Sequence, residues 1–248
     1  KLYKDIKPKR LTNIKNGIAV YDKHKLKIFF DITKPSSRLL NQNLHSGTLS
    51  FEMSYDNEKI FTNCGSIEKR IGKKPEFLRF SAAHTTLILN NTNISELVEK
   101  KSYKRIPQLI KYNYEELDDD FLYESIHDGY SKNFKSIIKR KMLISKKNIG
   151  INGEDTIIST KLSSRKKIYN IRFHLTPNCS CLVTNNEKNV LIKTHLNNSW
   201  IFKSENKLTL EDSIYINDGK RISKTKQIVI SGVASSPKKT ETWSIYKT

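Results

Sequence analysis

The stretch LHSGTLSFEMSYDNEKIFTNCGS, residues 44–66, carries the pattern that decides the fold. From Thr48 to Tyr55 polar and apolar residues alternate without exception. A period of two is typical of a β-strand that turns one face to a core and the other to water or a groove. The residues Asp56, Asn57 and Glu58 then provide good turn chemistry before a second candidate strand at 59–63. This stretch therefore predicts a β-hairpin.

The same signals recur along the chain. Residues 17–22 and 25–31 predict another hairpin, and 77–91 predicts two strands with a break at Ala82 and Ala83. Beyond residue 121, short apolar runs alternate with turn signals at roughly the 8–12-residue spacing of a sandwich or barrel. Single helical turns are expected only within 94–100 and 106–112. We predict an all-β fold, a large antiparallel two-sheet β-sandwich that forms one domain over residues 1–248.

The chain is strongly basic, with 45 Lys and Arg against 25 Asp and Glu and a formal net charge of +20. Such a surface attracts polyanions, namely nucleic acid, acidic polysaccharide or an anionic membrane. However, only nine of the basic residues are Arg, and Lys is scattered over nearly the whole chain, which also fits a general drift in composition. The acidic run at 114–121 is expected to be a solvated loop or edge, with cation binding as the alternative.

Other features bound the function further. No apolar run approaches the ~18 residues of a membrane span. Three cysteines give no disulfide framework and no CxxC zinc motif. Residue 1 is Lys and no signal peptide is visible, so we expect a fragment or a mature product.

Two histidines differ from the rest because small residues surround them. His45 lies in LHSGT and His84 in AAHTT, and each precedes a predicted strand. Small neighbours leave room for a ligand or an ion, and neutral imidazoles are ordinary zinc ligands. Asn63, at the end of the first hairpin, is placed to provide a third donor. The alternative for any single strand histidine is a structural role in packing.

Several segments, taken in order, resemble a known family. HSGTLSFEMSYDNEKIFTNCGS, RFSAAHTTLILNNTNISEL, IHDGYSKNF, KSIIKRKMLIS, GEDTI, NIRFHLTP and QIVISGV together resemble the C-terminal domain of heparinase II/III-like proteins, in the version found in alphaproteobacteria. The resemblance runs from about residue 17 to residue 246. It implies a β-sandwich that follows an N-terminal α/α toroid, which this chain lacks.

The resemblance also implies an activity. Complete members are lyases that cleave uronic-acid-containing polysaccharides, glycosaminoglycans among them, by β-elimination: the carboxylate is neutralised, a base removes the C5 proton and an acid protonates the leaving oxygen. Most of these groups come from the toroid, so we expect this chain to be inactive alone. An acidic polysaccharide and a toroid of the same protein are the expected partners, with the cell envelope or periplasm as the expected location.

The family motif carries over to this sequence position by position. Its first, catalytic histidine corresponds to Asn43 in NLHSGTLSF, a degenerate position, and its second histidine corresponds to His45. The resemblance implies His45, Asn63 and His84 as ligands of a structural Zn²⁺, and it places His45 and His84 beside the substrate. His45 is also the catalytic candidate beside the degenerate position Asn43. The resemblance also implies that His127 and His174 are packing residues.

Two alternatives stay open at this point. A non-catalytic carbohydrate-binding or cell-envelope scaffold module is favoured by the replaced positions Asn43, Gly47 and Asn63. A nucleic-acid-binding domain rests on charge alone, and no recognised nucleic-acid module accompanies it.

Overall fold

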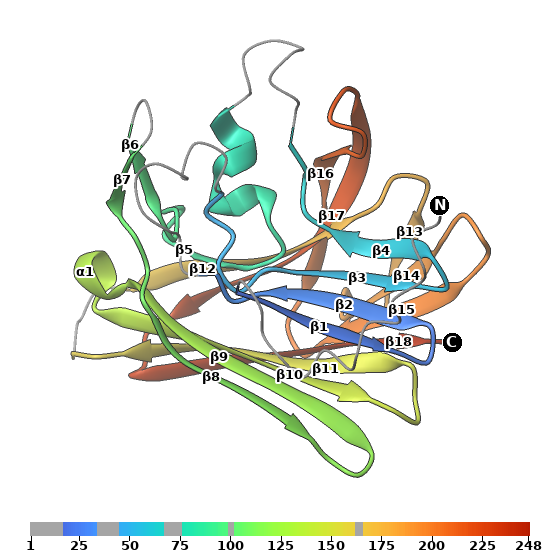
Figure 1. The fold of residues 1–248 in the computed structure, drawn as a ribbon, viewed down its shortest axis with the longest axis horizontal. Coiled ribbons are helices and arrows are strands. Elements are labelled where there is room, and N and C mark those ends of the chain that lie inside the picture. Colours follow the sequence, from blue (N-terminus) through green and yellow to red (C-terminus); the bar gives the residue numbers. More distant parts are fainter. Residues whose placement is uncertain (1–16, 34–44, 67–75, 99–101, 162–165) are drawn as a thin grey trace, which may run out of the picture.

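The chain folds into two antiparallel sheets that pack face to face (Figure 1). The computed structural model describes residues 17–33, 45–66, 76–98, 102–161 and 166–248. The first sheet consists of β1 (Ile18–Lys23), β2 (Leu26–Asp31), β3 (Phe51–Tyr55), β4 (Glu58–Thr62), β5 (Leu87–Leu89), β12 (Lys167–Leu175), β16 (Leu208–Ile216) and β17 (Ile222–Ala234). The second consists of β8 (Leu109–Glu116), β9 (Asp120–Tyr130), β10 (Ser136–Ser145), β11 (Gly150–Ser159), β13 (Ser180–Thr184), β14 (Asn189–Lys193), β15 (Ser199–Ser204) and β18 (Lys238–Lys247).

Short elements complete the described part of the chain. They are the strand pair β6 (Glu96–Val98) and β7 (Ser102–Arg105), the 3₁₀ turns η3 (Glu76–Arg79) and η4 (Ser81–Ala83), and the single helical turn α1 (Ser131–Phe134). No helix in the described ranges is long and apolar enough to cross a membrane.

The order of the strands places β4 at the centre of the first sheet. That order is β1-β2-β3-β4-β12-β17-β16, with β5 paired to β12; the second sheet runs β13-β14-β15-β18-β11-β10-β9-β8. The prediction of a two-sheet all-β sandwich is confirmed. The extension of a single domain to both termini includes residues outside the described ranges, so it stays a prediction.

The core lies between the sheets and is rich in aromatic rings. Phe51 of β3 stacks on Trp243 of β18 with ring centroids 5.6 Å apart and an interplanar angle of 2°. Phe173 of β12 meets Trp243 edge-on at 4.8 Å. Such pairs contribute about 0.5–1.5 kcal/mol each beyond the area that they bury. The alternation read from residues 48–55 therefore places Phe51 in the main contact between the sheets.

Two local predictions are wrong. The segment before His84 forms η3 and η4 and not a strand, because only Leu78 among its larger apolar residues is buried, while Phe77 and Phe80 are exposed. The helical turns predicted near 94–100 and 106–112 are instead β6 and the start of β8. Pairing with β7 and β9 overrides the weak local propensity there. The acidic run at 114–121 covers the end of β8, which is an edge strand, and the exposed turn that follows.

Candidate functional site

The two predicted histidines meet where the segments before β3 and β5 come together. Nδ1 of His45 lies 3.3 Å from Nε2 of His84, and the two rings are nearly perpendicular with centroids 5.3 Å apart. His45 is partly exposed, whereas His84 is only 5% exposed. Two residues 39 positions apart in sequence thus form one imidazole pair near the surface.

A buried hydroxyl pair fixes the segment that carries His45. The hydroxyls of Ser46 and Ser81 lie 2.8 Å apart, and both are fully buried. The hydroxyl of Ser81 donates to the carbonyl of Ser46, and the hydroxyl of Ser46 accepts from the amide of Ser95 at 2.7 Å. Because buried hydroxyls need partners, these bonds define one position for the segment. The small residue after His45 therefore holds the histidine to η4.

The ring of His84 is held in a defined tautomer. Its Nδ1 donates to the carbonyl of Phe80 at 2.8 Å, so in the neutral ring Nε2 carries the lone pair that faces His45. Burial, followed by the charge of His45, lowers the pKa of His84 to about 3. His84 is thus a neutral acceptor or ligand at physiological pH.

Gly47 is required by the closeness of the backbone to this ring. A Cβ at residue 47 would lie 2.6 Å from Cδ2 of His84 and 3.2 Å from its Nε2. Contacts below 3.0 Å force a neighbour to shift. Position 47 therefore has no room for a side chain in this arrangement.

Asn63 lies beside the pair but forms other bonds. Its Oδ1 accepts from the backbone N–H of Thr85 at 2.9 Å, and its Nδ2 donates to Glu52 at 3.3 Å. The amide thus joins the end of β4 to the residue that follows His84. Asn43 lies outside the described residues. The catalytic, substrate-binding and metal-binding roles given to these positions stay predictions.

A buried arginine from the second sheet supports both histidine segments. Arg140 of β10 is fully buried and forms a two-bond ion pair with Asp155 of β11, at 2.7 and 2.9 Å. Its remaining nitrogen donates to the carbonyls of Leu49, at 2.8 Å, and Thr85, at 2.7 Å. Leu49 has a positive φ of 61°, an uncommon conformation for a branched residue. One guanidinium therefore fixes the chain four residues after His45 and one residue after His84.

The imidazole pair has the spacing of two zinc ligands. Tetrahedral zinc with bonds of 2.0–2.1 Å places two imidazole nitrogens about 3.3 Å apart, which is the spacing of His45 and His84. The third predicted donor, the oxygen of Asn63, is already bonded to Thr85. Within the described ranges, no group of three or more His, Cys, Asp or Glu is placed to hold a metal. These residues thus fit as two ligands of a zinc ion and do not form a closed four-ligand site.

A second polar cluster close by lacks the chemistry of a nucleophile. The Sγ of Cys64 lies 3.6 Å from Nδ1 of His174, but burial raises the pKa of the thiol and lowers that of the imidazole to about 4. Nε2 of His174 donates to the carbonyl of Ala82 at 3.0 Å. Since an activated cysteine needs a lowered pKa, the Cys64–His174 pair is a structural contact between the end of β4 and β12.

Comparison with known proteins gives one family and several solved structures. The family model described as heparinase II/III-like, C-terminal, matches residues 14–244. Heparan sulfate lyase HepC from Pedobacter heparinus superposes with a TM-score of 0.75 at 13% identity, over 94% of this chain and 35% of that one. A heparinase III gene product gives a TM-score of 0.75 at 11% identity, over 95% and 35%.

A further heparinase III structure superposes with a TM-score of 0.65 at 16% identity, over 93% of this chain and 34% of the other. At these identities the structural likeness shows the fold alone. The chain spans about a third of the length of the structures it matches. No curated protein matches the chain.

Proposed function

The chain belongs to the heparinase II/III-like, C-terminal family, and from that premise we propose that it is the β-sandwich part of a lyase that cleaves acidic polysaccharides by β-elimination. The observation that carries the proposal is the family match over residues 14–244, almost the whole chain. The geometry supports it, because the fold brings His45 and His84 together from separate segments at a partly exposed position.

The sandwich alone provides only part of the chemistry that the reaction needs. Removal of the C5 proton requires a base, neutralisation of the carboxylate and an acid for the leaving oxygen. His45 can bind or position the sugar, whereas buried His84 serves to hold His45 in place. We therefore propose that an α/α toroid in the same protein provides the remaining groups, in keeping with solved relatives that are about three times as long as the matched part.

The test is an assay of the full-length protein that follows absorbance of the unsaturated uronate product. His45→Ala is expected to lower product formation at least tenfold, and Asn43→His is expected to raise it. His24→Asn is the matched control, because His24 is exposed in a turn with φ of 52°, which asparagine adopts readily. The isolated 248-residue chain is expected to form no product.

The absence of product across several uronic-acid polymers would refute the enzymatic proposal. Retained binding of such polymers without turnover would identify a carbohydrate-binding module instead. Since acidic polysaccharides are met at the cell surface, we also propose a cell-envelope location, which fractionation of cells tests directly.

A structural zinc ion forms part of the proposal. His45 and His84 would be its protein ligands within the described ranges, supported by their 3.3 Å spacing and the neutral state of His84. Zinc would then brace the two segments and leave the proton transfers to other groups.

A further inference from the structure

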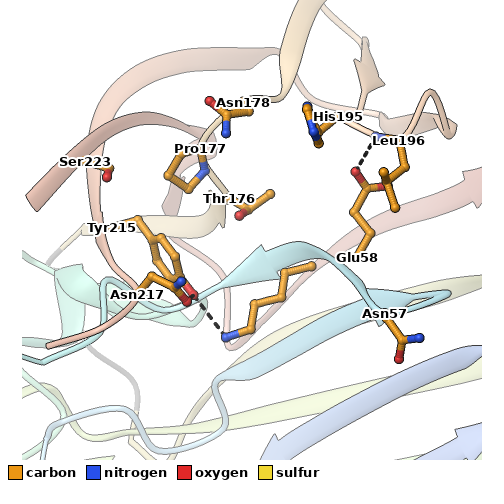
Figure 2. Close-up of a pocket in the computed structure, with 11 residues that line it drawn as sticks. Asn57, Glu58, Thr176, Pro177, Asn178, His195, Leu196, Tyr215, Asn217 and Ser223 are labelled. Carbon is orange, nitrogen blue, oxygen red and sulfur yellow. Dashed lines mark hydrogen bonds between the residues drawn. The ribbon is translucent and has the colours of Figure 1, made fainter. Parts of the chain in front are cut away.

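A hollow of about 520 Å³ lies beside the start of β4 (Figure 2). The start of β4, the turn at 176–178, the loop at 195–196 and the β16–β17 hairpin line it. Its size is that of pockets that take small ligands. Its lining includes charged groups, amides and hydroxyls, and therefore matches the surface of a sugar better than that of an apolar ligand.

Glu58 shapes one wall of the hollow. Its carboxylate accepts from the backbone N–H of Leu196 at 2.7 Å, from Nδ2 of Asn198 at 3.0 Å and from the hydroxyl of Thr194. Burial opposes ionisation of this group, but the hydrogen bonds outweigh it and keep the pKa of Glu58 below its ordinary value. The carboxylate of Glu58 thus binds the loop at 194–198, and these hydrogen bonds fix the position of that loop.

Lys59 brings a positioned positive charge into the same hollow. Its Nζ donates to Oη of Tyr215 at 3.0 Å, and that hydroxyl donates to Oδ1 of Asn217 at 3.1 Å. Tyr215 is 5% exposed, so it is a rigid support, while the Lys59 side chain is 48% exposed. The carboxylate of Glu52 lies 3.9 Å away, beyond hydrogen-bond range. The ammonium therefore keeps donors for an incoming acid.

The hollow adjoins the histidine site through two independent contacts. Glu52, beside Lys59, also accepts from the backbone N–H of Asn63 at 3.2 Å. The backbone N–H of Ile216, next to Tyr215, donates to the carbonyl of Cys64 at 3.0 Å, next to Asn63. A chain of polar contacts thus leads from Thr85, the residue after His84, through Asn63 and Glu52 to Lys59.

We propose that this hollow is a binding subsite for one acidic sugar of the polymer, with Lys59 bound to its carboxylate or sulfate group. Tyr215 and Asn217 hold the ammonium in position, and the amides and hydroxyls around it match sugar hydroxyls. The inference rests on the proposed function, because it takes the adjoining histidine site to contact the same chain. The turn and the first residues of β17 in this hairpin also carry exposed Lys220, Arg221 and Lys224, which favour the approach of a polyanion.

The experiment measures binding of three tetrasaccharides of equal length to the protein: unsulfated uronate, sulfated uronate and neutral. Lys59→Gln is expected to weaken binding of the acidic oligomers about tenfold and to leave the neutral one unchanged. Tyr215→Phe, which frees the ammonium, is expected to weaken it two- to fivefold. Lys111→Gln removes the same charge from an exposed position on β8 and is expected to change nothing. A dependence on Lys59 that is confined to the sulfated oligomer would assign the acid group as sulfate.

If Lys59→Gln binds the acidic tetrasaccharides as tightly as the unaltered protein, the inference is overturned and the proposed function is left in place. Absence of acidic binding by the unaltered protein would overturn the inference whatever the lyase assay gives. By contrast, absence of the unsaturated product in the separate lyase assay would refute the proposed function. Should Lys59→Gln be poorly folded, amide shifts of Tyr215 and Asn217 in the unaltered protein decide the matter: they move on binding, or the subsite lies elsewhere.

Discussion

The second sheet and the β3–β5 part of the first sheet are built differently. In the second sheet β10, β11 and β18 each run for ten residues in continuous register, and every other side chain is buried along β10. In the first sheet β3 and β4 have five residues each, β5 has three, and a bulge in the β3–β4 pairing leaves Ile60 and Phe61 both buried.

This difference indicates that the second sheet supports the structure and that the β3–β5 part of the first sheet carries the groups that could bind a ligand. The regular sheet presents a buried arginine at a fixed place, and the irregular region uses that arginine to hold loops that its own strands are too short to define. Polar groups that could contact a ligand, namely His45, Asn63 and Lys59, all belong to the irregular region. Each prediction below tests this division of roles, beginning with the largest effect.

Removal of Arg140 should have the largest effect. Arg140→Met leaves buried Asp155 without its ion-pair partner and leaves the carbonyls of Leu49 and Thr85 without the guanidinium donor. Loss of one member of a buried pair costs about 3–5 kcal/mol of unfolding free energy. Urea unfolding measures this cost. Lys139→Met, at the preceding residue of β10, removes a partly exposed ammonium that pairs with Glu124 and should cost less than about 1 kcal/mol. Equal costs for the two variants would contradict the supporting role.

Gly47→Ala should destabilise the protein less, by about 1–3 kcal/mol, because the added methyl group clashes with the ring of His84. The double variant Gly47→Ala/His84→Ala should recover part of this loss, since the clash is then absent. A double-mutant cycle from urea unfolding gives the coupling. Strictly additive costs would mean that the glycine serves another purpose.

Acid should destabilise the regular sheet through His127 of β9. Burial, followed by the charges of Arg140 and Arg105, lowers the pKa of this fully buried ring to about 3. Between pH 6.5 and about 3 the unfolded chain binds a proton that the folded chain does not, so the unfolding free energy falls by up to ~1.4 kcal/mol per pH unit. In His127→Gln, the unfolding free energy should fall less steeply with decreasing pH, by this amount. An unchanged slope would show that His127 is protonated in the folded state.

Zinc should stabilise the irregular region slightly. With zinc at ten times its dissociation constant, the unfolding free energy should rise by about 1.4 kcal/mol. It should appear as a small rise in Tm in the unaltered protein and in His24→Asn, and be lost in His45→Ala. A rise of the same size in all three proteins would place the ion at another site.

Much of the fold could be predicted from the sequence because alternation and turn residues are local signals. They located the hairpins at 18–31 and 51–62. The segment before His84 was misread, because its two 3₁₀ turns depend on bonds from Ser81 to Ser46 and Asn93, which alternation does not reveal.

The supporting pair was missed although a signal exists. Arg140 is in phase with Ile138, Met142 and Ile144, and Asp155 is in phase with Ile151 and Ile157, so both charges occupy core positions. The two residues are direct partners in the β10–β11 register. Opposite charges at paired core positions of a hairpin predict a buried ion pair. The commitment of the Asn63 oxygen to Thr85, by contrast, arises from tertiary contacts and could not be read from spacing.

Binding of an acidic saccharide at the irregular end of the first sheet is tested most directly by a crystal structure of the protein with an unsulfated uronate tetrasaccharide. The sugar should lie along the surface from His45 to the hollow at Lys59, with one carboxylate within hydrogen-bond distance of the Lys59 ammonium. A saccharide bound on the outer face of β8–β11, with the surface around β4 empty, would contradict this placement of the site.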